Sequence, residues 1–305
     1  MNIQYCVNCA RPYNPPCPLC IECQSDPEIL NEIIDDELNR RRTAGLRKVT
    51  QITPYPGEKA SLILAIFILL IVAIVAGIIS FGAVIFIVVV NLFSLKADHI
   101  SSKNGMLHVN ESSYGTLYRI SRIAAYRLGI PLPEIYVTQN PDYNAYTQGF
   151  YKYGFIVMNS GMVADFTAEE IMFVLGHEMG HMGLYHTSWL RLMAPGMSMG
   201  SNFIAAPVMR VIFNVWSVKA EYSADRAGLV ACRDVSPPVK SLLKLAGGGD
   251  VESNVKLSDI LKDDISNKSE KDDIVDGLAE YLGTHPYISN RIKALLSYQR
   301  SNVVS

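Results

Sequence analysis

The sequence predicts a mainly α-helical protein with a small β-sheet (α+β), and three observations predict this fold class. Five of the six cysteines stand near the N-terminus in Cys-x-x-Cys spacing. A long apolar segment without charges follows them, and the rest of the chain combines amphipathic helical patterns with short β-type runs. We therefore expect four parts, in chain order: a cysteine module (1–25), a charged linker (26–59), a membrane-embedded segment (60–96) and a C-terminal domain (97–305).

The cysteine module has the spacing of a zinc ribbon. Each Cys-x-x-Cys pair supplies half of a tetrahedral structural site, and two pairs close the site without an open position. Cys6 and Cys9 form the first pair. The second pair consists of Cys17 with Cys20 or of Cys20 with Cys23. Disulfides are the alternative, but the basic flank described next indicates a reducing cytoplasm. We expect one structural zinc ion on four of these five cysteines.

The linker turns from acidic to basic toward the apolar segment. Acidic residues follow Asp26, and basic residues gather between Arg40 and Lys48. A basic cluster beside a membrane segment indicates contact with lipid headgroups and a cytoplasmic N-terminus. The cluster does not indicate nucleic acid, because the net charge of the chain is -2 and no aromatic residues alternate with the arginines.

The apolar segment is long enough to enter a membrane. No residue between Lys59 and Lys96 is charged, the chain is 49% hydrophobic and its mean hydropathy is +0.17. As one straight helix, about 36 residues would span roughly 54 Å, against a hydrocarbon thickness near 30 Å. We therefore favour a hairpin that turns at 77–82 over a single span. A hairpin returns the C-terminal domain to the cytoplasm, whereas a single span places it outside.

Short β-type runs lie in the first half of the C-terminal domain. Residues 134–138 and 154–158 are predicted as strands, and 144–149 as a polar strand or bulge. An exposed edge of such a sheet can hold an extended peptide by main-chain hydrogen bonds. The alternative is an ordinary small sheet that covers a helical core.

A long helix is predicted after these strands. Thr167 and Glu170 form a capping box, in which each side chain satisfies a backbone donor of the first turn, so that the helix begins near Ala168. Apolar residues at helical spacing continue the helix to about His186.

This helix carries a metal-and-base motif. His177 and His181 share one face at i and i+4 and can bind one ion, while Glu178 lies about 100° around the helix, near enough to act as a base on a water at that ion. A tetrahedral zinc still needs one more protein ligand. His186 does not supply it, because on a continuous helix it lies about 140° away from His181. We expect His186 on the polar face or in the surroundings of the ligands.

A carboxylate pair further along the chain can complete the site. Glu221 and Asp225 stand at i and i+4 in a run whose composition suits a helix. One of them can bind the metal while the other holds a ligand or stabilises the reacting oxygen. Alone, such a pair is typical of a solvated helix face. Its significance comes from a zinc helix that lacks a third ligand.

Three motifs in this order resemble the HtpX-like family of membrane-associated zinc endopeptidases, distant relatives of the CAAX prenyl proteases. The motifs are His-Glu-x-x-His at 177–181, Glu-x-x-x-Asp-Arg-Ala-Gly at 221–228 and Thr-His-Pro at 284–286, the last followed by Arg291. The similarity covers roughly 114–296. It implies a zincin-like helical peptidase domain of the gluzincin type.

The resemblance also implies roles for single residues. His177, His181 and Glu221 would be the ligands of a catalytic zinc ion, and Glu178 the general base. Asp225 would orient a ligand or assist proton transfer. His285 would lie near the site, although a turn residue that starts the last helix is an equal alternative.

These observations predict a membrane-anchored zinc endopeptidase that hydrolyses peptide bonds with metal-activated water. By resemblance, its substrates would be proteins or peptides, among them misfolded membrane proteins, and its role protein quality control. We expect it in a prokaryotic cell membrane, and the favoured hairpin places the peptidase domain in the cytoplasm. The alternative is a non-catalytic zinc-binding scaffold that recruits partners through the zinc ribbon. Glu178 opposes that alternative, because a scaffold needs no base.

Overall fold

The computed structural model of the chain describes residues 4–5, 12–13, 38, 52–71, 74, 105–149, 154–190, 206–247 and 286–303. Several predicted features lie outside the described residues: most of the membrane segment 60–96, His285, and the zinc-ribbon ligands Cys6, Cys9, Cys17, Cys20 and Cys23. Near these cysteines the structure describes a short antiparallel hairpin of β1 (Gln4–Tyr5) and β2 (Pro12–Tyr13).

A small mixed sheet precedes the central helix of the domain, in the strand order β3-β4-β6-β5. Its strands are β3 (Leu107–His108), β4 (Glu134–Thr138), β5 (Ala145–Gln148) and β6 (Phe155–Asn159). The strands β4 and β6 pair in parallel, and the other two pairs are antiparallel. The predicted strands are confirmed, and the polar run between them forms β5 at one edge of the sheet.

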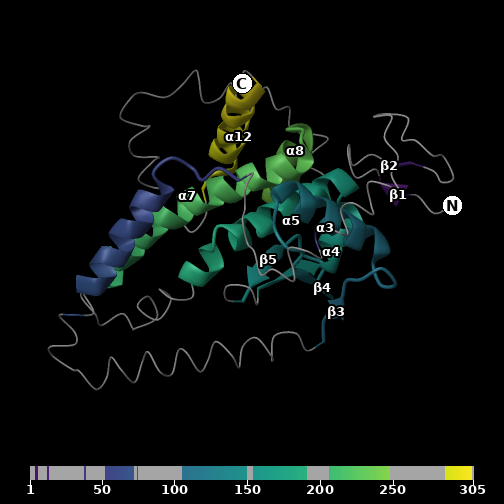
Figure 1. The fold of residues 1–305 in the computed structure, drawn as a ribbon, viewed down its shortest axis with the longest axis horizontal. Coiled ribbons are helices and arrows are strands. Elements are labelled where there is room, and N and C mark those ends of the chain that lie inside the picture. The colour runs from purple at the N-terminus through teal and green to yellow at the C-terminus, as the bar shows by residue number, and fades with distance from the viewer. Residues whose placement is uncertain are drawn as a thin grey trace.

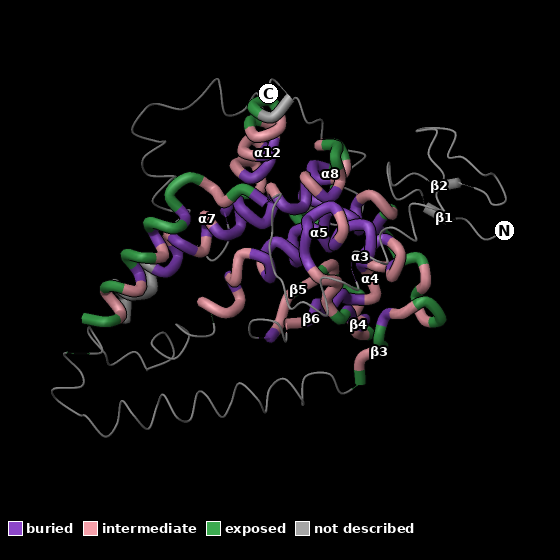
Figure 2. Tube along the Cα trace, viewed as in Figure 1, coloured by how far each residue is buried: buried purple, intermediate pink, exposed green. Residues whose placement is uncertain are grey.

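Six helices make up most of the described domain, which is therefore mainly helical as predicted. They are α3 (Gly115–Leu128), α4 (Ser160–Asp165), α5 (Ala168–Gly183), α7 (Ala206–Cys232), α8 (Ser236–Gly247) and α12 (Ile288–Val303). The helix α5 lies at the centre, where it contacts α3, α7, α8 and β5 (Figure 1). Figure 2 shows the consequence, a helix that is buried over nearly its whole length.

The ends of α5 follow from local chemistry. The capping box is confirmed: Thr167 N–H donates to Glu170 Oε2 at 2.8 Å, and Glu170 N–H donates to Thr167 Oγ1 at 3.3 Å. The C-terminal end differs from the prediction, because α5 stops at Gly183 rather than near His186. Tyr185 then adopts a left-handed backbone conformation with φ 63°, which turns the chain before it becomes helical again at 186–190.

The helices α5 and α7 approach each other closely at three glycines. A Cβ atom added to Gly180 would lie 2.7 Å from the Ala227 Cβ, and one added to Gly228 would lie 2.5 Å from the Phe173 ring. A Cβ on Gly176 would likewise lie 2.9 Å from the Gly228 Cα. Only hydrogen fits at these positions, so the glycines set the closest approach of the two helices.

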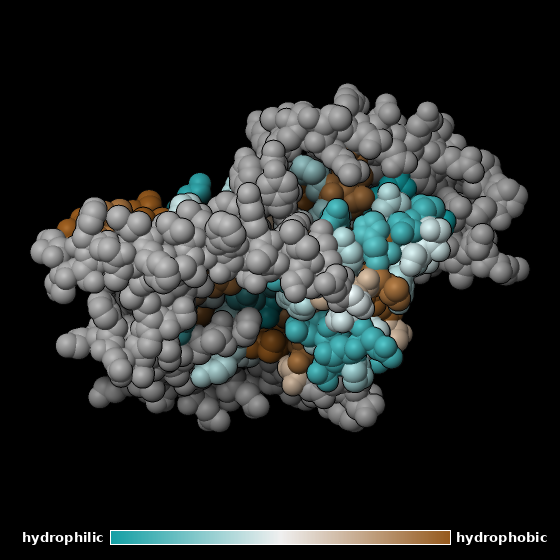
Figure 3. Space-filling model, turned by 90° about the horizontal axis from the view of Figure 1, so that it is seen from below, coloured by the Kyte–Doolittle hydropathy of each residue, from teal (hydrophilic) through white to brown (hydrophobic). Residues whose placement is uncertain are grey.

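The first part of the predicted membrane segment 60–96 packs on α7. Residues 58–71 are helical, and Figure 1 shows this helix beside the N-terminal half of α7. Ala65 joins Phe213, Trp216 and Ala220 in a small apolar cluster. The outer side carries exposed apolar side chains, among them Ile63 and Phe67, and apolar atoms lie at this end of the molecule in Figure 3. Within the described residues, no helix is both long enough and apolar enough to cross a membrane.

Candidate metal centre

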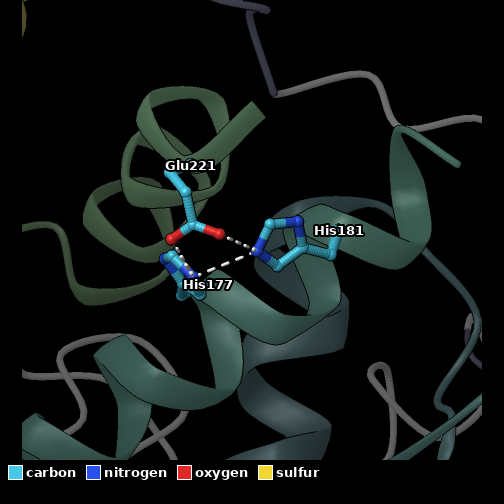
Figure 4. A group of neighbouring side chains, drawn as sticks. All are labelled: His177, His181 and Glu221. Carbon is cyan, nitrogen blue, oxygen red and sulfur yellow. Dashed lines mark hydrogen bonds and ion pairs between the residues drawn. The ribbon is translucent and has the colours of Figure 1, made fainter. Parts of the chain in front are cut away.

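Two imidazoles and one carboxylate converge where α5 passes α7 (Figure 4). The Nε2 atoms of His177 and His181 are 3.1 Å apart. Glu221 reaches them from α7, with Oε2 at 3.6 Å from His177 Nε2 and Oε1 at 3.4 Å from His181 Nε2. The i, i+4 spacing on α5 places the two rings on one face, and the close approach of the helices brings the carboxylate opposite them.

The separations of these donor atoms suit a zinc ion. A tetrahedral zinc at about 2.0–2.1 Å from each ligand requires ligand atoms to lie roughly 3.3 Å from one another. The three observed separations, 3.1, 3.4 and 3.6 Å, bracket that value. Two imidazoles with one carboxylate also form a donor set that is typical of catalytic zinc sites, in which a fourth position stays open.

The charge of the site also favours a cation. Burial of the His181 ring would lower its pKa, but the Glu221 carboxylate opposite it outweighs burial and holds the pKa of His181 above its ordinary value. Glu178 and Asp225 act on the ring in the same direction. Three carboxylates thus surround the imidazoles, and a divalent ion would relieve their mutual repulsion.

Asp225 contacts the Nδ1 side of the His177 ring, away from His181 and Glu221. Its Oδ1 lies 2.9 Å from His177 Nδ1 and accepts a hydrogen bond when Nδ1 carries the proton. The lone pair of His177 is then on Nε2, which faces His181 and Glu221. Arg291 of α12 binds the same carboxylate through Nε at 2.8 Å and Nη2 at 2.6 Å. Burial would raise the pKa of Asp225, but the Arg291 guanidinium outweighs burial and holds that pKa below its usual range.

His186 lies against the His181 ring, which agrees with one of its two predicted places, the surroundings of the predicted ligands, although the continuous helix used to place it is not present. Its Nδ1 is 2.9 Å from His181 Nδ1. The physical reason is the turn at Tyr185, which ends α5 and folds the next residue back toward His181. The prediction of a continuous helix to His186 was therefore wrong, whereas the prediction that His186 is not among the converging donors agrees with the geometry.

Glu178 faces the hollow in which the three donors lie. The hollow has a volume of about 280 Å³ and is lined by residues of α5, α7 and the edge strand β5. Thr147 of β5 donates a hydrogen bond of 2.6 Å to Glu178 Oε2. Glu178 is only 7% exposed, so its carboxylate is held in place mainly by protein contacts.

The structure thus brings together most of the predicted site. His177, Glu178, His181, Glu221 and Asp225 form one cluster. Sequence reasoning gave no role to three residues of the surroundings: Arg291, Thr147 and Glu58. Arg291 belonged to a quoted motif, and its position shortly after Thr-His-Pro was the available signal. No local pattern marks Thr147 or Glu58, because their partners lie 31 and 128 residues away.

Comparison with known proteins places this geometry in a family. The sequence profile of Peptidase family M48 matches residues 114–299 of this chain. The plastoglobule-localized metallopeptidase 48 of Arabidopsis thaliana is 33% identical over 147 residues, which are 46% of this chain and 42% of the plant protein. The chain therefore spans less than half of that relative's length. A protease HtpX homolog of Streptococcus thermophilus is 24% identical over 256 residues, 69% of this chain and 82% of the homolog.

Among solved structures, the crystal structure of S. mikatae Ste24p aligns with a TM-score of 0.43 and 19% identity, and the alignment covers 69% of this chain and 56% of that one. The family match runs from the start of α3 into α12 and includes the three converging donors on α5 and α7. The chain belongs to Peptidase family M48, a family of metallopeptidases.

Proposed function

We propose that the protein is a membrane-anchored, zinc-dependent endopeptidase. One observation carries the proposal: the two α5 histidines and Glu221 converge at zinc-like separations beside Glu178, in a hollow that opens on a sheet edge. His177, His181 and Glu221 would hold the ion. Zinc, when bound in this way, acts as a Lewis acid that makes water a competent nucleophile near neutral pH and polarises a carbonyl.

The chain's own residues supply the proton transfers. Glu178 accepts a proton from the attacking water at its carboxylate and passes it to the amine that leaves when the peptide bond breaks. Thr147 positions this carboxylate through the hydrogen bond to Oε2. Asp225 and Arg291 keep His177 in the tautomer that offers Nε2 to the ion.

The edge strand β5 is the proposed binding strand for substrate. One edge of β5 pairs with β6, and the residues Ala145, Tyr146 and Thr147 of β5 line the hollow. An extended polypeptide could add to β5 by main-chain hydrogen bonds, which demand no particular side chains. We therefore propose protein or peptide substrates of varied sequence, with misfolded membrane proteins among them and protein quality control as the role.

Anchoring and the second zinc ion belong to the proposal as well. The uncharged residues between Lys59 and Lys96 and the exposed apolar side of the helix at 58–71 support insertion into a bilayer, which we propose to be a prokaryotic cell membrane. The basic cluster before them supports a cytoplasmic N-terminus. Four of the cysteines at 6, 9, 17, 20 and 23 would hold a structural zinc ion by their spacing.

The Glu178→Gln variant tests the activity. We expect it to retain the catalytic zinc, because Glu178 is not among the converging donors, and to lose cleavage of an unfolded protein such as casein by at least a hundredfold. Zinc content by atomic emission and cleavage by gel or fluorescence are the two measurements. A Glu169→Gln variant of α5 is the matched control and should cleave normally. Cleavage at the wild-type rate by Glu178→Gln overturns the proposal.

A further inference from the structure

We infer that Glu58 is a positioning residue for the metal centre and acts on His181 through His186. Glu58 opens the helix at 58–71, most of which belongs to the predicted membrane segment 60–96. The junction between the membrane anchor and the peptidase domain would then be a structural part of the zinc site. The inference rests on the proposed function, since it assigns a role toward the proposed ligand His181.

The first observation is a continuous chain of polar contacts from the ligand to this junction. His181 Nδ1 lies 2.9 Å from His186 Nδ1, on the side of the ring that faces away from the other donors. His186 Nε2 lies 2.9 Å from Glu58 Oε1. The residues Glu58 and His186 are 5% and 3% exposed, so water does not substitute for either partner.

The hydrogen bonds that join His181, His186 and Glu58 can have only one arrangement of protons when His181 binds a cation through Nε2. The ring must then carry its proton on Nδ1 and donate it to His186 Nδ1. His186 accepts at Nδ1 and therefore carries its own proton on Nε2, which it donates to Glu58 Oε1. The carboxylate is an acceptor only. Glu58 thus determines, over two hydrogen bonds, which nitrogen of His181 is free for the metal.

The second observation is that Glu58 is itself fixed. Ser223, two residues after the ligand Glu221, donates a short hydrogen bond to Glu58 Oε2. Tyr55 N–H donates to the Ser223 hydroxyl at 2.7 Å, and the Tyr55 ring stacks on Tyr222 with 4.8 Å between centroids. The Glu58 carboxylate is therefore held between α7 and the chain that follows α5.

A third set of contacts fixes the chain just before Glu58. The Arg226 guanidinium lies 4.9 Å from the centroid of the Tyr55 ring and 4.5 Å from that of Tyr298 on α12. It also donates to the Pro54 carbonyl at 3.1 Å. Because these contacts hold Pro54 and Tyr55 without the Glu58 side chain, a Glu58 variant should keep the segment in place and lose only the side-chain contacts of Glu58 with His186 and Ser223.

The two ligand histidines are thus supported in parallel ways. His177 donates directly to a buried carboxylate, Asp225, which α7 supplies and Arg291 of α12 holds. His181 donates to a buried carboxylate through an intervening imidazole, and the carboxylate comes from the membrane junction. Outer partners of metal-bound histidines typically change metal affinity by about 10–100-fold when they are removed.

The test measures metal binding of the full chain in detergent micelles, independently of proteolysis. Zinc affinity is obtained by competition with a chromophoric chelator, and the visible absorption of the cobalt-loaded protein reports ligand geometry. The variants are Glu58→Ala, Glu58→Gln, which keeps an acceptor oxygen, and His186→Phe, which interrupts the chain in the middle. The matched control is Leu69→Ala, which removes an apolar contact of the same helix with α7 but leaves the chain of contacts intact.

We expect Glu58→Ala and His186→Phe to weaken zinc binding by about 10-fold or more and to shift the cobalt spectrum. Glu58→Gln should restore much of the affinity, and Leu69→Ala should match the wild type.

Wild-type affinity and spectrum in Glu58→Ala overturn the inference. So does an equal loss in Leu69→Ala, since general docking of the helix would then explain the effect. Should Glu58→Ala fail to fold, His186→Phe decides the matter, because wild-type affinity and spectrum in that variant also overturn the inference. Absence of zinc binding in the wild type would instead overturn the proposed function.

Discussion

Asp225 Oδ1 lies 2.9 Å from His177 Nδ1, although 48 residues separate the two along the chain. The same oxygen is 2.6 Å from Arg291 Nη2. One buried carboxylate therefore joins α5, α7 and α12 and leaves the Nε2 side of His177 directed at Glu221. The contact links the fold to the proposed chemistry, because the charge that orients the proposed ligand His177 also attaches the last helix.

Replacement of Asp225 by asparagine should weaken zinc binding by about 10–100-fold. The amide keeps the size of the carboxylate, but it lacks the charge and directs N–H groups at Arg291, which is itself only a donor. Chelator competition measures the affinity. The exposed Asp142→Asn change is the control and should leave zinc binding unaltered. Equal affinities of Asp225→Asn and the wild type would contradict the role of this contact.

Replacement of Thr147 by valine should lower kcat without loss of zinc. Valine has nearly the shape of threonine but cannot donate to Glu178 Oε2, and a hydrogen bond to a charged group contributes about 1.5–3 kcal/mol. We expect a decrease in kcat of about tenfold or more. Thr138→Val on β4 is the matched control and should be near the wild type. A lower zinc content in Thr147→Val would instead assign the residue to the metal site.

Replacement of Gly228 by alanine should destabilise the domain by about 1–3 kcal/mol, because the added Cβ would meet the Phe173 ring at 2.5 Å. The same substitution at Gly115 provides the control. No atom lies within 4 Å of its Cβ position, so Gly115→Ala should be neutral or stabilising by about 0.5–1 kcal/mol. Thermal unfolding in detergent measures both. An unchanged Tm for Gly228→Ala would show that α5 and α7 can separate at little cost.

Cys232 should react slowly with maleimides in the folded protein. Burial raises the pKa of its thiol, so that the reactive thiolate is scarce at pH 7–8, and the labelling rate should increase only well above the pKa of an ordinary thiol, about 8.5. Mass spectrometry resolved by peptide follows this site separately from the other cysteines. An introduced cysteine at the exposed position 234, Asp234→Cys, should react quickly. Equal rates at the two positions would mean that Cys232 is accessible.

Local patterns in the sequence determine the parts of the fold and site that could be predicted. Thr167 and Glu170 lie three residues apart, and both the capping box and the start of α5 depend on that spacing alone. The donors on α5 and the Glu221–Asp225 pair follow from helical periodicity. The strands at 134–138 and 154–158 follow from short apolar runs bounded by turn residues.

The residues that sequence reasoning missed depend on contacts between distant parts of the chain. His186 was placed by extension of a regular helix, and a single left-handed residue, Tyr185, invalidated that geometry. Glu58 was assigned to a charged linker because charge near a membrane segment usually faces water. In the structure it is buried against His186 and Ser223, which no spacing in the sequence reveals.

The glycine-lined contact of α5 and α7 has a consequence for how the enzyme could accept varied substrates. Where the glycines bring the two helices this close, sliding one helix along the other would push backbone atoms into the Ala and Phe side chains that already lie against them. In the proposed peptidase, the metal centre would therefore be set when the domain folds and would stay the same for each substrate. Adaptation to different polypeptides would then come from the wall of the hollow that β5 forms, since among the described strands β5 pairs with β6 alone. Under the proposed function, the fold would thus separate a fixed chemical half from an adjustable recognition half.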